Sequence, residues 1–261
     1  MSPFTLSGAS RMPRVLFVVL LLTLACSGAA QADTWNAGQE ITYLQLEWAG
    51  EGLPTGTPAS RLLNADFNTV YGSSFDEVTV GGTYTMSFDS AGAVEAYLPA
   101  SGAPGPLNAN LLDPATSHSG SFGGDVVALT LDVNFSSRTG GTGPSFGSLV
   151  IAGIPAQFPQ FPELSGVDGL TVGQFLDQLD ILLGGGSSAY GTIAELDPIA
   201  IALENSFTDG TPSAFAQDAL APPSSSSGGG GGGTGSVPEP PSVLLLGVGM
   251  LGLMGIALSR K

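Results

Sequence analysis

The sequence contains a single cysteine and a single histidine in 261 residues. Cys26 lies in an N-terminal segment that we expect to be removed, so the mature chain has no disulfide framework, no thiolate metal site and no cysteine nucleophile. One histidine is too few for a zinc site, which needs several His or Cys ligands. His118 itself is typical of a solvated loop residue, because no Gly-x-Ser-x-Gly elbow supports a Ser-His-Asp triad.

Basic residues are also scarce, with six Lys plus Arg against 22 Asp plus Glu and a formal net charge of −16. Four of the six cations lie near the chain ends: Arg11, Arg14, Arg260 and Lys261. Only Arg61 and Arg138 lie between them. Because phosphate binding needs clustered cations, we expect no nucleic-acid partner. The acidic balance favours solubility outside the cell and a loose attraction of divalent cations.

The N-terminal residues predict a signal peptide over 1–32. Two arginines precede an apolar run over 15–25, which leads to Ala30-Gln31-Ala32, the small-x-small pattern that signal peptidase cleaves. An apolar run of about 11 residues is too short to span a bilayer, which favours cleavage after Ala32 over a retained anchor. Two alternatives stay open: translation from Met12, and a lipoprotein signal ending at Cys26.

The C-terminal residues have three parts, each flush with the next. Residues 237–241 read Val-Pro-Glu-Pro-Pro, residues 242–258 are apolar, and residues 259–261 read Ser-Arg-Lys. The prolines hold the motif in an extended rod. The apolar part predicts a transmembrane helix about 24 Å long, short for a hydrocarbon core of about 30 Å. Basic residues at the end should stay in the cytoplasm, which places everything before the helix outside.

This plan resembles the PEP-CTERM sorting signal of exported bacterial proteins. The resemblance implies a partner, an exosortase-like membrane protease that recognises and cleaves the segment, and a precursor anchored by one membrane pass before release to the surface or the medium. The segment is also labelled ice-binding protein C-terminal domain, a name that implies no ice binding here. The residues concerned are the motif Val237, Pro238, Glu239 and Pro240 and the membrane stop Arg260 and Lys261. The alternative is an ordinary tail anchor whose flanking prolines are accidental.

The middle of the chain predicts a mainly β fold with a small α subdomain. Period-two patterns over 33–157, clearest over 125–135, favour an antiparallel β-sandwich. The segments that we expect as strands are 41–48, 77–80, 83–89, 93–98, 125–135 and 148–154. Residues 158–221 predict a helical hairpin, and residues 222–236, rich in Ser and Gly, a flexible linker.

The helical hairpin is predicted from two capping boxes. The first, Thr171 to Gln174, opens a helix that stops at Gly184, and the second, Thr192 to Glu195, opens another. Pro198 leaves two possibilities for the second helix, either an interior proline or a shorter helix that Asp197 caps.

No motif in the chain identifies catalytic, cofactor-binding or metal-binding residues, and we expect no cofactor. Asp168-Gly169 and Asp209-Gly210 could be calcium loops, but they are more typical of turns. The leading hypothesis is a non-enzymatic surface or extracellular-matrix protein. The alternative is a carbohydrate-binding or carbohydrate-cleaving domain with extracellular polysaccharide as its partner, since Trp35 and Trp48 could stack on sugars and Asp177 and Asp180 could act as paired carboxylates.

Overall fold

The computed structural model describes residues 35–50, 55–72 and 77–223. The predicted signal peptide, most of the predicted linker and the whole predicted sorting signal lie outside these residues. The described residues belong to one compact unit, which ends at Pro223. The structure therefore does not test the predictions for Ala30, Ala32 and the C-terminal motif.

Helices dominate the described residues. The α-helices are α2 (Gln45–Trp48), α3 (Pro58–Val70), α4 (Ala91–Tyr97), α5 (Gly120–Phe135), α6 (Ile154–Gln157), α7 (Val172–Leu183), α8 (Ile193–Glu204) and α9 (Ala214–Ala219). Short 3-10 turns are η1 (Ser136–Arg138), η2 (Phe146–Ser148) and η3 (Pro162–Val167). The strands are β1 (Val78–Gly81), β2 (Thr85–Phe88), β3 (Leu111–Leu112), β4 (Val150–Ile151) and β5 (Leu220–Ala221).

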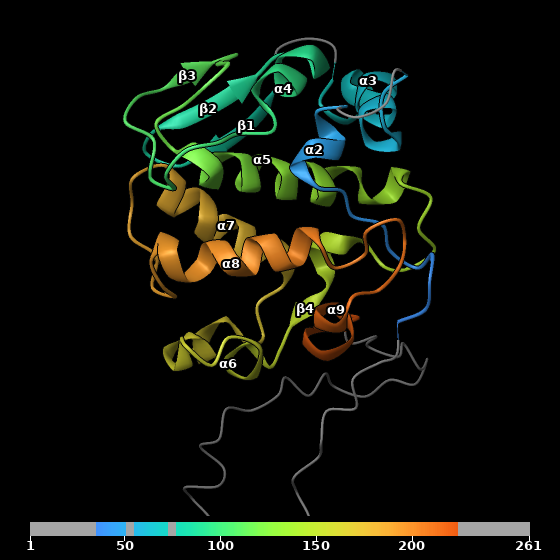
Figure 1. The fold of residues 1–261 in the computed structure, drawn as a ribbon, viewed down its shortest axis with the longest axis vertical. Helices are drawn as coiled ribbons and strands as arrows, with labels where there is room; N and C mark the ends of the chain where they lie inside the picture. The colour runs from blue at the N-terminus through green and yellow to red at the C-terminus, as the bar shows by residue number, and fades with distance from the viewer. Residues whose placement is uncertain (1–34, 51–54, 73–76, 224–261) are drawn as a thin grey trace, which may run out of the picture. The chain divides into compact units, whose positions relative to one another are not determined.

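Helix α5 lies at the centre of this arrangement. The three-stranded sheet β1-β2-β3 and α4 lie on one side of it, and α7 and α8 lie on the other (Figure 1). Beyond α8 come α6, α9 and the small β4-β5 sheet (Figure 1). The side chains of all these layers meet in one hydrophobic cluster. The helices predicted over 158–221 therefore share their core with the preceding residues.

The prediction of a mainly β fold with an antiparallel sandwich is wrong. Residues 125–135 belong to α5, in which every residue from Phe122 to Asp132 is buried. A helix that is buried on all sides has no polar face, so it loses the 3.6-residue period that marks amphipathic helices. What remains is an apolar run, and periodicity alone cannot distinguish such a run from a buried strand.

The other predicted strands have mixed outcomes. Residues 77–80 and 83–89 do form a hairpin, in which β1 pairs antiparallel with β2 in the register Val78 opposite Phe88. Residues 93–98 lie mostly in α4, which Ser90 caps by accepting from the Ala93 N–H. Residues 41–48 contain the single turn α2 and an isolated bridge from Thr42 to Thr208, and residues 148–154 contain the two-residue strand β4 between the end of η2 and the start of α6.

Both predicted helices of the 158–221 segment are confirmed. Thr171 accepts from the Gln174 N–H at 3.1 Å, and Gln174 in turn accepts from the Thr171 N–H at 2.9 Å, as a capping box requires. Helix α8 runs from Ile193 to Glu204 with Pro198 inside it. The longer of the two possible helices is therefore the one formed, and its proline is accommodated in the second turn.

The C-terminal end of α7 holds the β1-β2 hairpin. Asp180 accepts from the Gly81 N–H at 2.7 Å, and the Tyr84 N–H donates to the Gly184 carbonyl at 3.1 Å. A Cβ on Gly184 would lie 2.6 Å from Gly82 Cα, so this backbone approach requires glycine. Asp177 is exposed on the solvent-facing side of α7. Asp180 is instead a hydrogen-bond acceptor that holds the hairpin.

No helix within the described part of the chain has the length and apolar character of a membrane span. The transmembrane helix predicted over 242–258 lies outside that part.

Candidate functional site

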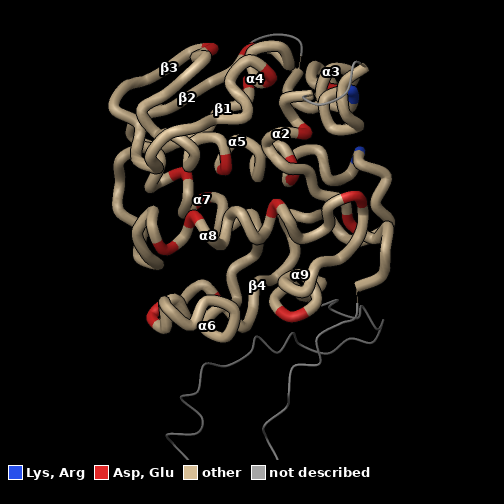
Figure 2. The backbone as a smooth tube through the Cα atoms, viewed as in Figure 1, with Lys and Arg blue, Asp and Glu red and all other residues tan. Residues whose placement is uncertain are grey.

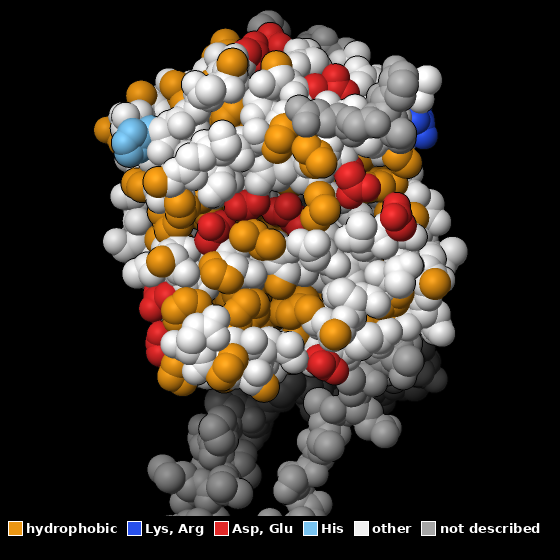
Figure 3. Space-filling view, viewed as in Figure 1, with side chains coloured by type: hydrophobic (Ala, Val, Ile, Leu, Met, Phe, Trp, Pro, Cys, Tyr) orange, Lys and Arg blue, Asp and Glu red, His pale blue; other side chains and the backbone are white. Residues whose placement is uncertain are grey.

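Four carboxyl groups meet where α5 and α8 pack together. Asp125 and Asp132 come from α5, and Asp197 and Glu204 come from α8. Each pair is seven residues apart, which is about two helical turns, so both carboxyls of a helix lie on one face. We call these four residues the interhelical carboxyl cluster. Figure 3 shows acidic side chains gathered in the band between α5 and α8.

The cluster is largely shielded from water. Asp132 is fully buried, Glu204 is 3% exposed, Asp125 5% and Asp197 8%. Charged groups at such depth normally have a cationic partner, because removing a charge from water costs several kcal/mol, on the order of 5 or more.

No arginine supplies that partner within the described residues. Arg138 forms an ion pair with Asp66 at 3.5 Å, and Arg61 donates to the Gly56 carbonyl at 2.6 Å. Figure 2 shows how acidic positions are spread along the tube while basic ones are confined to one side. The cluster must therefore be neutralised in another way.

Asp132 is held by donors from the N-terminal segment. Its Oδ1 accepts from the Tyr43 N–H at 2.9 Å and from the Trp48 indole N–H at 3.2 Å. Burial nevertheless raises the pKa of Asp132 well above its usual range, and these two hydrogen bonds oppose the rise only in part. Asp132 therefore ties the segment around α2 to the central helix.

Asp125 has a polar partner on each side. Gln45 donates its amide to Asp125 Oδ1 and accepts from the Ala100 N–H at 2.9 Å. On the α8 side, the carboxyl of Asp197 acts electrostatically on that of Asp125, so a proton on either acid relieves the repulsion between them. Burial first, and then the charge of Asp197, raises the pKa of Asp125 to about 7.

Gly124 permits this close approach. A Cβ at this position would lie 2.6 Å from Gln45 Cδ and 2.8 Å from Ala100 Cβ. A Gly-Gly pair is typical of a turn, but Gly123 and Gly124 lie within α5. Because Gly124 has no side chain, Gln45 and Ala100 can pack directly against the backbone of the helix.

Glu204 completes the cluster. Burial raises its pKa well above the usual range, and the charges of Asp125, Asp132 and Asp197 raise it further. Its Oε1 is buried and has no hydrogen-bond partner within the described residues, and the same holds for Asp197 Oδ1 and Asp132 Oδ2. Burial and mutual repulsion thus favour the neutral form of these carboxyls, and within the described residues they form no ion-pair network.

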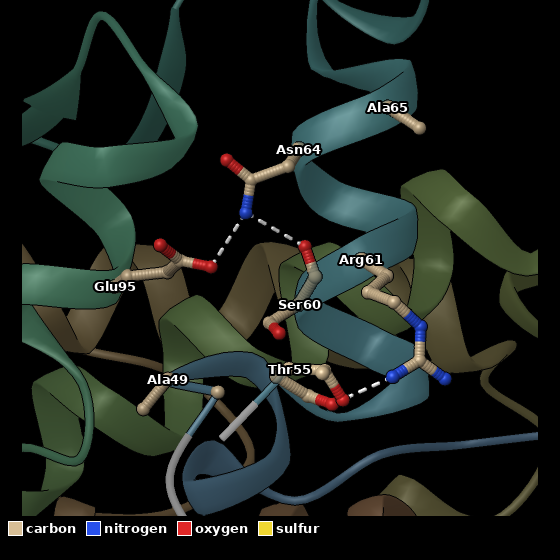
Figure 4. A pocket seen from close by; sticks show the side chains of 9 residues that line it. Ala49, Thr55, Ser60, Arg61, Asn64, Ala65 and Glu95 are labelled. Atoms are coloured by element: carbon tan, nitrogen blue, oxygen red, sulfur yellow. Dashed lines mark hydrogen bonds between the residues drawn. The ribbon is translucent and has the colours of Figure 1, made fainter. Parts of the chain in front are cut away.

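A second feature is an open cavity of about 720 Å³ beside α2, α3 and α4. Figure 4 shows Asn64 of α3 facing Glu95 of α4, where its amide donates to Glu95 Oε1 at 2.6 Å and to the Ser60 carbonyl at 2.8 Å. The lining of the cavity is polar or small: Ala49, Gly50, Thr55, Gly56, Ser60, Arg61, Asn64, Ala65 and Glu95. With no aromatic side chain in this lining, the cavity offers no stacking platform for a sugar.

The structure places the other residues that the sequence singles out. Trp35 and Trp48 are 4% and 0% exposed, so neither indole is available for stacking on a sugar. His118 is exposed, and its Nδ1 lies 3.1 Å from the Pro106 carbonyl rather than against the carboxylate that a triad would need. Asp209 has a positive φ of 53°, and Asp168 accepts from the Ile154 N–H at 2.9 Å, so both belong to turns.

Sequence reasoning missed the interhelical carboxyl cluster. A usable signal exists, since both helices place acids seven residues apart, but it becomes visible only when 125–135 is recognised as a helix. Within the part of the chain that the structure describes, no three acidic, His or Cys side chains are grouped so as to hold a metal ion.

Comparison with known protein families confirms the resemblance at the C-terminus. Residues 236–261 match the PEP-CTERM protein-sorting motif. The match spans Val237 to Pro240 and the basic end Arg260-Lys261, and a motif of this kind indicates an exported protein that an exosortase processes. Neither the curated proteins nor the solved structures contain a match to this chain.

Proposed function

We propose that this protein is an exported, non-enzymatic surface or extracellular-matrix protein, whose helical unit is carried outside the cell and released or attached through its C-terminal signal. The observation that carries the proposal is the match of residues 236–261 to the PEP-CTERM motif. The signal peptide expected over 1–32 agrees with it, because it gives the chain a route of export that does not depend on the tail.

The organisation of the chain supports the same conclusion. The compact unit ends at Pro223, directly before the Ser- and Gly-rich residues. A coil of about 13 such residues has an r.m.s. span on the order of 20 Å, enough to hold a folded unit clear of a membrane enzyme. The motif then stays accessible to an exosortase-like protease while the domain is already folded.

Replacing Pro238, Glu239 and Pro240 by alanine should abolish processing. The three residues supply the rigid extended rod and the acidic side chain, so the variant should accumulate as an uncleaved precursor in the membrane fraction. Immunoblotting of fractionated cells with an antibody against the folded unit measures both size and location. The matched control replaces the serines at 224–226 by alanine and should be processed normally. A triple-alanine motif variant with unchanged size and location would refute the proposal.

The non-enzymatic part of the proposal is tested on the purified unit, residues 33–223. We expect no saturable binding on polysaccharide arrays and no turnover of glycoside substrates, because both tryptophans are buried and the open cavity has no aromatic lining. Saturable binding that is lost in Asn64→Ala or Glu95→Ala would instead establish the cavity as a carbohydrate site.

A further inference from the structure

The interhelical carboxyl cluster lies at the contact that organises the domain. Helix α8 packs along α5, and α5 also contacts α2, α7 and β1. A force between these two helices therefore acts on the whole core. The cluster supplies such a force, because the charges of Asp125, Asp132 and Asp197 all act on Glu204.

The ionisable groups that are electrostatically coupled to the cluster from neighbouring segments, Tyr43, Glu47 and Tyr97, are all acids. Helix α2 contributes Glu47, whose charge acts on Asp132, and α4 contributes Tyr97, on whose pKa the charge of Asp125 acts. Helix α7 contributes no partner, since Asp177 is exposed and Asp180 binds Gly81. Beyond α5, η1 contributes Arg138, which is paired with Asp66, while α9 contributes only the exposed Asp218.

Protons fit this cluster better than a metal ion does. The charge of Asp197 acts on Asp125, and a proton on either carboxyl relieves that repulsion without a metal ion. Among the described residues no three acidic side chains converge as metal ligands would. The oxygens without partners, Glu204 Oε1 and Asp197 Oδ1, are at positions where a neutral acid is tolerated and a carboxylate is costly.

We propose that the interhelical carboxyl cluster is a proton-dependent lock: with protons held on it, α5 and α8 pack, and when the cluster ionises, repulsion and solvation loosen that contact. The protein is then most stable in mildly acidic surroundings and loses stability on moving to alkaline ones. For an exported protein, whose surroundings are not buffered like a cytoplasm, this makes the domain responsive to external pH.

The direction of the effect follows from proton linkage. In the unfolded chain an aspartate titrates near pH 4, about 3.9, whereas in the folded domain the pKa of Asp125 is raised to about 7. The folded state therefore binds more protons between these values, so this contribution to stability is complete below about pH 4 and is lost as pH rises through about 7. Each proton that folding retains changes the unfolding equilibrium constant by about tenfold per pH unit.

The test compares wild type with Asp197→Asn in the unit 33–223, by urea unfolding at pH 5, 6, 7 and 8. The substituted asparagine keeps the volume and can donate to Asp125, but it removes one acid from the cluster. We expect the wild-type unfolding constant to rise at least about tenfold between pH 5 and 8, and the variant to rise markedly less and to be the more stable of the two at pH 8.

The difference between the proteins is the decisive quantity, because Glu40, whose pKa burial raises to about 7, adds its own pH dependence to both. Glu204→Gln is the second variant, in case Asp197→Asn does not fold. The matched control is Asp177→Asn on the exposed face of α7, which should follow wild type. Equal pH dependence in wild type and both cluster variants would overturn the proposal.

A further measurement tests whether the cluster binds calcium instead of protons. Repeating the pH 8 measurement with calcium chloride and then with a chelator should leave the difference between wild type and Asp197→Asn unchanged. If calcium restores wild type but not the variant, the cluster is a cation site and the proton-lock proposal is wrong.

Discussion

Asp132→Ala is expected to lower the free energy of unfolding by about 2–6 kcal/mol, because it leaves two buried donors without an acceptor at about 1–3 kcal/mol each. The donors are the Tyr43 N–H and the Trp48 indole N–H, and both residues are buried. A loss of this size is a large part of the total stability of a domain, about 5–15 kcal/mol. The unit 33–223 should therefore unfold at a markedly lower urea concentration in this variant than in wild type.

The measurement is urea unfolding at pH 5, because burial raises the pKa of Asp132 and acidic conditions favour its uncharged form. Asp132→Asn is the matched control, since its amide oxygen still accepts from both donors. It should lose less than half as much stability as Asp132→Ala. If the two variants are equally destabilised, the hydrogen bonds are not what ties the α2 segment to α5.

Trp35→Ala is expected to cost about 3–5 kcal/mol, the usual loss for a large aromatic side chain in a core. Trp35 is 4% exposed and packs edge-on against Phe207, with ring centroids 5.2 Å apart. Its indole N–H donates to the Leu220 carbonyl at 2.8 Å, and its backbone exchanges two hydrogen bonds with the Gln217 side chain. One residue thus fastens the beginning of the domain to its end.

The position of Trp35 also bears on export. The predicted cleavage after Ala32 would leave Asp33 and Thr34 before it, so a mature chain cut there would keep the residue that closes the domain. Trp35→Phe keeps most of the apolar area but loses the indole N–H, and it should cost about 1–3 kcal/mol. Thermal unfolding of the three proteins should give the order of stability wild type, then phenylalanine, then alanine. An alanine variant as stable as wild type would show that the two ends close without this contact.

Which segments form helices and which form strands could be predicted only in part, because burial removes the periodic pattern from some of them. Helix α7 is amphipathic, with a sharp capping box at Thr171 and Gln174, so local sequence describes it well. Helix α5 is buried on all sides, so its residues reflect the tertiary environment and not the helical period. The hairpin β1-β2 is correctly predicted because alternation and the Gly81-Gly82 turn act within a few residues of each other.

Of the two candidate sites, the sorting motif could be predicted from the sequence and the interhelical carboxyl cluster could not. The sorting motif is linear, so the resemblance to a PEP-CTERM signal could be recognised from adjacent residues without any fold, and the match over 236–261 confirms that resemblance. The sequence alone also determined the acidity of the chain and, with a single cysteine, the absence of a disulfide framework within it. Tertiary structure alone decided that Asp125 meets Asp197, far away in the sequence, and that both tryptophans are buried. Contacts between residues so far apart in the sequence depend on how the helices pack, and no local sequence pattern in this chain predicts that packing.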